Sequence, residues 1–277
     1  MLKLYKSGNS ICTQKVMITM REKGLEPEMH NINLFANEQY DPAYLKINPK
    51  GVVPTLVDEG RIIVESTLIC EYLDEAYPEP PLVPADPWLK TQMRLWSKAV
   101  DEGVFEATRE ISFSAMFREK LRAMTESQRE TRFRNVGDPQ RSARYRSTYA
   151  EGVASPYVLQ AVASYEKLFK SMEAALGHEG TGGPWLLGGA MTLADINLMP
   201  FVARLNYLNL LGLWTAARPN VLAWWRRVQD VPSFRAAIVE QTGEADAANM
   251  HTHGSKIKEA LGLRREEYLA ALHAPAA

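Results

Sequence analysis

The sequence predicts a fold of two parts, an α/β domain followed by an all-helical domain. β-rich runs alternate with helical patterns up to residue 78, and five prolines then fall within residues 78–88. After the prolines, apolar residues recur at three- and four-residue steps, which is typical of amphipathic helices. We therefore expect an α/β domain at 1–80, a stiff linker at 81–88, an all-helical domain at 89–245 and a helical tail at 246–277.

In the first domain the elements follow the order βαβ and then ββα. We expect a strand at 1–5, a helix at 10–25, a strand at 26–34, a short helix or turn at 41–51, a hairpin at 53–66 and a helix at 66–78. Gly24 and Pro78 are helix stop signals, and Asp58-Glu59-Gly60 is a hairpin turn. A parallel unit followed by an antiparallel hairpin predicts a mixed sheet of about four strands.

The composition is that of a globular protein, with 46% hydrophobic and 23% charged residues. The net charge of −1 gives no overall attraction to nucleic acid or to a membrane surface, so neither is an expected partner. No run reaches the ~18 apolar residues of a membrane span, and no signal-peptide core is present. Two cysteines are too few for a disulfide framework, so we expect a reducing, cytoplasmic setting.

A candidate binding site lies in the stretch "GVVPTLVDEGRIIVESTLICEYL" at residues 51–73. X-Pro bonds alone adopt cis readily, and a cis Val53–Pro54 bond would free the Val53 backbone to pair with a ligand. Glu65 and Ser66 fall at the next helix start, where unpaired N–H groups and the helix dipole favour anions. Ser66 could hold a carboxylate and Glu65 an ammonium, which suits a small peptide with a free α-amino-acid end. An ordinary helix cap is the alternative for Ser66.

The string "INPKGVVPTLV…IIVESTLICEYLDEAYP", the proline-rich linker and "TLADI" in a helical half resemble the cytosolic glutathione transferases. The resemblance reaches from the N-terminus to about residue 240. It implies a thioredoxin-like first domain that binds glutathione, with Val53 on the backbone of the tripeptide's cysteine. Glu65 and Ser66 would hold the γ-glutamyl end, whereas Gln39, or less directly Lys50, would reach the glycyl carboxylate.

Two further expectations come with this resemblance. Thr192 of "TLADI" would cap a central buried helix, with Asp195 reaching back to the Thr192 backbone N–H, a role in folding. The family is usually dimeric, which implies a homodimer here, with a heterodimer left open. Asp101, after the linker, matches a position that reaches toward the neighbouring subunit's glutathione.

Glutathione chemistry needs a thiolate at neutral pH, and a hydroxyl at a helix N-terminus stabilises one. Serine-type relatives carry their serine six residues before the helix valine, which indicates Ser10. Counting back from Glu22-Lys23-Gly24 indicates instead Thr13, another donor, or Cys12, which could form a mixed disulfide with glutathione. An N-cap also explains Ser10, and a small buried hydrophobe explains Cys12.

The second substrate is the least defined part of the prediction. Residues 105–157 are long for this family, and residues 118–146 carry nine Lys or Arg against four Asp or Glu. That basic stretch is either a solvated face or a lid. The aromatic side chains would line a pocket for a flat, apolar aromatic substrate. They are Phe105, Phe113, Phe117, Tyr145 and Tyr149.

The same region and the long "RIIVES…AVDE" stretch are similar to bacterial β-etherases, which are glutathione transferases that cleave lignin β-aryl ethers. There the thiolate attacks the carbon next to a ketone and expels a phenolate. The alternatives are a non-catalytic ligand-binding member or partner subunit, and a glutathione-dependent dehalogenase or isomerase. His251 and His253 lack further ligands at metal-site spacing, so we expect no metal and a hinge before the tail helix.

Overall fold

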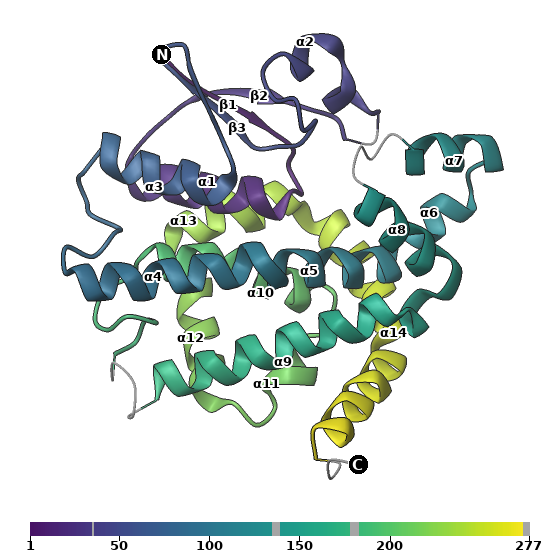
Figure 1. Cartoon of the computed structure of the whole chain (residues 1–277). Helices are drawn as coiled ribbons and strands as arrows, with labels where there is room; N and C mark the ends of the chain where they lie inside the picture. The colour runs from purple at the N-terminus through teal and green to yellow at the C-terminus, as the bar shows by residue number, and fades with distance from the viewer. Residues whose placement is uncertain (35, 135–138, 178–182, 274–277) are drawn as a thin grey trace. The chain divides into compact units, whose positions relative to one another are not determined.

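The structure is a computed structural model that describes residues 1–34, 36–134, 139–177 and 183–273. The chain forms two compact units. The first comprises Met1–Lys98, Ala174–Pro200 and Ala223–Gly243, and the second comprises Ala99–Glu173, Phe201–Leu222 and Glu244–Ala277. Figure 1 follows the chain through both units by colour.

The first unit contains the predicted mixed sheet. Its strands are β1 (Leu2–Lys6), β2 (Glu28–Asn31), β3 (Thr55–Asp58) and β4 (Arg61–Val64), in the spatial order β2-β1-β3-β4. β1 and β2 run parallel, whereas β3 is antiparallel to both β1 and β4. The expected parallel unit followed by an antiparallel hairpin is therefore confirmed.

Helices α1 (Ile11–Glu22) and α3 (Ser66–Ala76) pack side by side on one face of this sheet (Figure 1). Their buried faces share a core with Leu4 and Leu56, both with no exposed surface. A short 3-10 turn (Glu38–Tyr40) and α2 (Pro42–Leu45) join β2 to β3. This arrangement is the thioredoxin-like domain that the sequence predicts.

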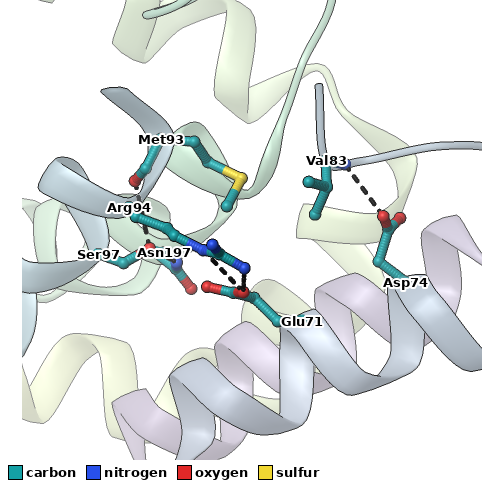
Figure 2. A network of polar contacts seen from close by, with 7 residues as sticks. All are labelled: Glu71, Asp74, Val83, Met93, Arg94, Ser97 and Asn197. Carbon is teal, nitrogen blue, oxygen red and sulfur yellow. Dashed lines mark hydrogen bonds and ion pairs between the residues drawn. The ribbon is translucent and has the colours of Figure 1, made fainter. Parts of the chain in front are cut away.

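A polar network fixes the chain where the linker leaves α3 (Figure 2). The Asp74 carboxylate accepts from the backbone N–H groups of Leu82 at 2.7 Å and Val83 at 3.2 Å, and it pairs with buried Lys23. Arg94 donates two hydrogen bonds to Glu71, at 3.1 and 2.8 Å, and so joins α4 (Pro87–Ala99) to α3. The proline-rich linker is thus held by side chains at both of its ends.

The helix α10 (Leu193–Tyr207) is buried nearly all round, as predicted. The expected cap is confirmed, because Thr192 N–H donates to Asp195 Oδ2 at 3.1 Å and Ala194 N–H donates to Thr192 Oγ1 at 3.2 Å. Asp195 also accepts from Trp224 Nε1 at 2.9 Å. Burial raises the pKa of Asp195 to about 6, against the opposing effect of these donors.

The remaining elements are helical, as the sequence predicts. They are α5 (Phe105–Ser112), α6 (Arg118–Arg122), α7 (Glu126–Arg134), α8 (Pro139–Glu151), α9 (Pro156–Leu176), α11 (Gly212–Thr215), α12 (Pro219–Gln229), α13 (Pro232–Phe234) and α14 (Glu240–His273). Single π-helical turns at Val100–Val104, Phe113–Phe117 and Arg235–Val239 and a 3-10 turn at Gly152–Ala154 connect some of them.

The basic region between α5 and α8 has its own small core. Phe113 stacks on Tyr145 with ring centroids 4.7 Å apart, and Leu121 and Phe133 are buried with them. Arg146 lies over the Phe133 ring and also pairs with Glu130. Phe113 and Tyr145 therefore pack against each other within the protein, a use the pocket prediction did not foresee.

The expected hinge at His251 and His253 is wrong, because both lie inside α14. The helical path is interrupted earlier, at Gly243, whose φ of 69° and ψ of 162° are not helical. Farther along, the helix packs so closely that a Cβ on Gly254 would lie 1.9 Å from the Leu208 carbonyl oxygen. Only glycine permits this contact.

Candidate functional site

Strand register brings three segments to one edge of the sheet. Tyr5 of β1 pairs with Thr55 of β3, which pairs with Val64 of β4. The loop after Lys6, the turn before Thr55 and the Glu65–Ser66 step therefore leave that edge side by side, in this order. Neighbouring strands lie ~4.8 Å apart, so the three segments span roughly 10 Å, about the length of an extended tripeptide.

The middle segment is the Val52–Thr55 turn, and its Val53–Pro54 peptide bond is cis, as predicted. Two buried side chains hold it. Tyr44 Oη donates to the Val52 carbonyl at 2.6 Å, and Asn48 Nδ2 donates to the same oxygen at 3.0 Å. Both side chains also lie within hydrogen-bond distance of Thr55 Oγ1, at 3.0 and 2.9 Å. The turn is thus formed before any ligand arrives.

The residue before this turn, Gly51, has to be a glycine for two reasons. Its φ is +59°, in the left-handed region, and a Cβ there would lie 2.9 Å from the Tyr40 ring. The Gly51 N–H donates to the Asn48 carbonyl at 2.9 Å. The string "NPKGVVP" therefore encodes a side-chain clamp, a tight left-handed residue and the turn itself.

Glu65 and Ser66 occupy the predicted helix start. Ser66 is the first residue of α3, so its backbone N–H has no intrahelical acceptor. Glu65 has φ 69° and ψ 109°, a conformation that L-residues rarely adopt and that costs about 1–3 kcal/mol. Such strain is concentrated at binding sites, which makes Glu65 a candidate ligand-binding residue.

In the structure Glu65 already holds an ammonium. Lys50 Nζ lies 2.6 Å from Glu65 Oε1, and both side chains are largely exposed. The sequence assigned these two residues to opposite ends of a tripeptide, but the structure pairs them with each other. An exposed pair of this kind is worth at most ~1 kcal/mol, so a ligand ammonium can compete with Lys50 for Glu65.

Gln39 lies in the 3-10 turn after β2 and is 7% exposed. Its Nε2 donates weakly to the Leu34 carbonyl at 3.5 Å, and its Oε1 is buried without a hydrogen-bond partner among the described residues.

The first segment, which we call the Ser7–Thr13 loop, comprises the loop after β1 and the first turn of α1, and it carries the candidate hydroxyls. Ser10 is the N-cap of α1, and its Oγ accepts from the Thr13 N–H at 3.3 Å. A serine hydroxyl that accepts one hydrogen bond can still donate its own proton. Thr13 is fully buried, and its Oγ1 has no hydrogen-bond partner among the described residues. Cys12 is partly exposed and forms no disulfide within the described chain.

This geometry favours Ser10 over the other two candidates. Its half-buried hydroxyl lies at the N-terminus of α1, where the unpaired N–H groups and the helix dipole favour an anion. A second contact ties this helix to the Glu65–Ser66 segment, because fully buried Lys15 donates to Thr67 Oγ1 at 2.6 Å. The starts of α1 and α3 are thereby fixed with respect to each other.

Sequence reasoning missed four residues here, namely Lys6, Tyr44, Asn48 and Gln241. Lys6 ends β1, is 8% exposed, and donates from Nζ to Gln241 Oε1 at 2.9 Å. Its position in phase with Leu2 and Leu4 on the strand was a signal that a charge would be buried. Asp101 belongs to the second compact unit, on an exposed stretch of the π-helical turn Val100–Val104.

Within the described ranges, the structure gathers no group of three or more His, Cys, Asp or Glu side chains suited to a metal ion. No helix in the same ranges has the length and apolar character that a membrane crossing requires.

The sequence matches the family description "Glutathione S-transferase, N-terminal domain" over residues 4–81 and "Glutathione S-transferase, C-terminal domain" over residues 138–227. "Protein LigF" of Sphingobium sp. (strain NBRC 103272 / SYK-6) is 45% identical over 103 residues. That alignment covers 36% of this chain and 40% of the relative. "Tetrachloro-P-hydroquinone reductive dehalogenase" of Sphingobium chlorophenolicum is 27% identical over 245 residues, which cover 85% of this chain and 95% of the relative.

Among solved structures, the β-etherase LigF from Sphingobium sp. strain SYK-6 is similar with a TM-score of 0.74 and 28% identity. The superposition covers 85% of this chain and 98% of that one. A thioredoxin-like domain followed by a helical half defines the class. The chain belongs to the glutathione S-transferase superfamily, close to the β-etherases.

Proposed function

We propose that the chain is a glutathione-dependent transferase or lyase, in which an activated glutathione thiolate attacks an aromatic electrophile. The observation that carries this proposal is the sheet edge, where the Ser7–Thr13 loop, the Val52–Thr55 turn and Glu65–Ser66 lie in the order that an extended tripeptide needs. Family membership supports glutathione as that tripeptide.

In this assignment each segment binds one part of glutathione. The Val53 backbone N–H and C=O pair with the cysteinyl residue beside the cis Pro54. Ser66 N–H and Oγ hold the γ-glutamyl carboxylate, and Glu65 accepts from the γ-glutamyl ammonium in place of Lys50. Gln39 and, in a second arrangement, Lys50 are the candidates for the glycyl carboxylate. Ser10 donates its hydroxyl proton to the thiolate, with Thr13 and Cys12 as the alternatives.

The reaction we propose is a substitution at carbon. The thiolate electron pair forms a carbon–sulfur bond at the carbon next to a ketone, and the carbon–oxygen bond of an aryl ether breaks. The phenolate leaves with the bonding electron pair of that carbon–oxygen bond and takes a proton from solvent. No oxidant or reductant is consumed, and the products are a glutathione thioether and a phenol. The relation to the β-etherase LigF supports this substrate class.

The test is turnover of a β-aryl ether ketone with glutathione, followed as release of the phenol, beside calorimetry of glutathione binding. We expect both binding and release. Binding with no phenol release from any aryl ether, and with no halide release from a generic aryl halide, would reject the transferase in favour of a non-catalytic glutathione-binding protein.

A dehalogenase is the second candidate, because the relative named for reductive dehalogenation matches over 85% of this chain. A chlorinated hydroquinone assayed in parallel distinguishes the two, since it releases chloride instead of a phenol. Faster turnover of the chlorinated substrate than of the aryl ether would favour the second candidate.

We further propose a homodimer, with Asp101 near the neighbouring subunit's glutathione. Light scattering gives the mass directly, and a monomer at micromolar concentration would reject the assignment of Asp101. A shift in mass on mixing with a relative would instead support a heterodimer.

A further inference from the structure

The last residue of β1 is a nearly buried cation. Lys6 follows Leu4 on the same face of the strand, the face covered by α1 and α3, and only 8% of its surface is exposed. Burial lowers the pKa of Lys6, because the charged ammonium loses solvation. A lysine in this position destabilises the fold unless something compensates its charge.

The protein provides no compensating charge for Lys6 among the residues that the structure describes. Its Nζ has one polar partner, the neutral amide oxygen of Gln241 at 2.9 Å. By contrast Lys23, also buried, pairs with the Asp74 carboxylate and donates to the Pro80 carbonyl. The two lysines border the same helix, so the lack of a carboxylate at Lys6 is specific to its end of the domain.

That end is the one that carries Ser10. The Ser10 N–H donates to the Ser7 carbonyl at 3.0 Å, so the loop turns back toward the end of β1. A Cβ on Gly8 would lie 3.7 Å from the Gln241 carbonyl oxygen, which places Gln241 against the loop as well as against Lys6. Two buried hydroxyls, Thr13 Oγ1 and Thr242 Oγ1, flank this region and have no hydrogen-bond partner in the part of the chain that the structure describes.

We propose that Lys6 is a second thiolate-stabilising group, and that its ammonium supplies to the glutathione sulfur the positive charge that Ser10 lacks. The proposal rests on the proposed function and deepens it. Gln241 is a positioning residue. Its neutral amide orients the Lys6 ammonium without neutralising its charge, and its backbone supports the loop. The positive charge of Lys6 is then compensated by bound glutathione when its sulfur is ionised to the thiolate.

The test compares Lys6→Met with wild type, using the ionisation of bound glutathione measured by ultraviolet absorbance of the thiolate. A cation within ~4–6 Å lowers the pKa of an acid by about 1–3 units, so Lys6→Met should raise the pKa of the bound thiol by about one unit. Binding of glutathione should weaken correspondingly at high pH, where the thiolate binds. Binding of S-methylglutathione, whose sulfur carries no charge, should stay within about twofold.

Methionine matches the length of lysine without its charge, so Lys6→Met should fold and should melt at a higher temperature than wild type at neutral pH. Gln241→Leu keeps the ammonium but removes its orienting partner, and it should raise the bound thiol's pKa by less. Lys3→Met is the matched control, because Lys3 lies on the same strand but is half-exposed and paired with Glu28 at 3.2 Å. Lys3→Met should leave the pKa of the bound thiol unchanged.

An unchanged thiol pKa in Lys6→Met would overturn the inference, and so would weaker binding of glutathione and S-methylglutathione alike, which would assign Lys6 to a carboxylate. In both cases wild-type binding and turnover would leave the proposed function standing. Failure of the wild type to bind glutathione would overturn both.

Discussion

Two regions at the same sheet edge differ in how their polar atoms are satisfied. In the Val52–Thr55 turn, the Val52 carbonyl and the Thr55 hydroxyl each have two partners, Tyr44 and Asn48. In the Ser7–Thr13 loop, the Thr13 hydroxyl has no partner among the described residues, and nearby Lys6 has only a neutral one. The polar atoms of the turn are satisfied without a ligand, whereas, within the described ranges, the Thr13 hydroxyl and the charge of Lys6 are not.

We infer from this difference that the turn contributes to glutathione binding and that the loop contributes to activation of the thiol. A fully hydrogen-bonded turn is rigid and offers a fixed backbone edge, so it contributes affinity that does not depend on the charge of the sulfur. Donors that are prearranged but unsatisfied stabilise charge where it develops, and they do so without reorganisation. Substitutions in the two regions should therefore affect different kinetic constants.

The largest effect is expected from Ser10→Ala. It removes the hydroxyl donor and the cap of α1, and loss of one preorganised donor typically costs about 10²–10³ in kcat. Because the Val52–Thr55 turn is untouched, KM for glutathione should change little. Steady-state kinetics at saturating glutathione measures both constants. Ser7→Ala, which leaves the loop's backbone contacts in place, is the control. Equal losses of kcat in the two variants would contradict the role of Ser10 as the hydroxyl donor to the thiolate.

Asn48→Ala should produce the next largest effect, in the opposite constant. The buried Val52 carbonyl and Thr55 hydroxyl each lose one partner, which should cost about 1–3 kcal/mol of stability. KM for glutathione should rise roughly tenfold as the turn loosens, while kcat at saturation stays near wild type. Thermal unfolding and glutathione kinetics measure the two effects, with exposed Asn206→Ala on α10 as control. A kcat loss without a KM change would contradict the separation of the two regions.

Glu65→Gln should weaken glutathione binding by about fivefold. The site is half-exposed, so the lost charge-assisted contact to the γ-glutamyl ammonium is worth about 1 kcal/mol. Calorimetry with glutathione and with a des-amino analogue tests this, because the analogue lacks the ammonium and should bind both proteins alike. Equal weakening for both ligands would indicate a collapsed helix start instead.

Lys50→Met is expected to give the smallest effect, and its sign is informative. If Lys50 only occupies Glu65, removing it should strengthen glutathione binding by about twofold, since an exposed pair is worth less than ~1 kcal/mol. If Lys50 moves to the glycyl carboxylate on binding, affinity should fall instead. The dissociation constant from calorimetry at low ionic strength distinguishes the two, and Lys46→Met is the matched surface control.

Local sequence made one of these regions predictable. The turn, its cis bond, the helix start at Ser66 and the Thr192–Asp195 cap are all encoded within a few residues, so their positions follow from short-range preferences. The same reasoning found the mixed sheet and the buried helix α10, because periodicity reports which face of an element is covered.

Local sequence indicated the candidate hydroxyls of the other region but not the long-range contact of Lys6 beside them. Gln241 lies 235 positions from Lys6, and no pattern near either residue indicates that they meet. Likewise Phe113 and Tyr145 were expected in a pocket, yet they stack in a small core, since an aromatic residue has the same periodicity in both settings. The hinge was placed at His251 and His253 from composition, whereas the backbone bends at Gly243.

Gly243 has a consequence for how the chain can be shortened. The turn of α14 before it belongs to the first compact unit and carries Gln241, while the 30 residues that complete the helix belong to the second. A truncation just after Gly243 keeps Gln241 and its contacts with Lys6 and the Ser7–Thr13 loop. A truncation just before Gln241 removes those contacts. One continuous helical segment therefore contributes to both compact units, and the unit boundary coincides with the bend at Gly243.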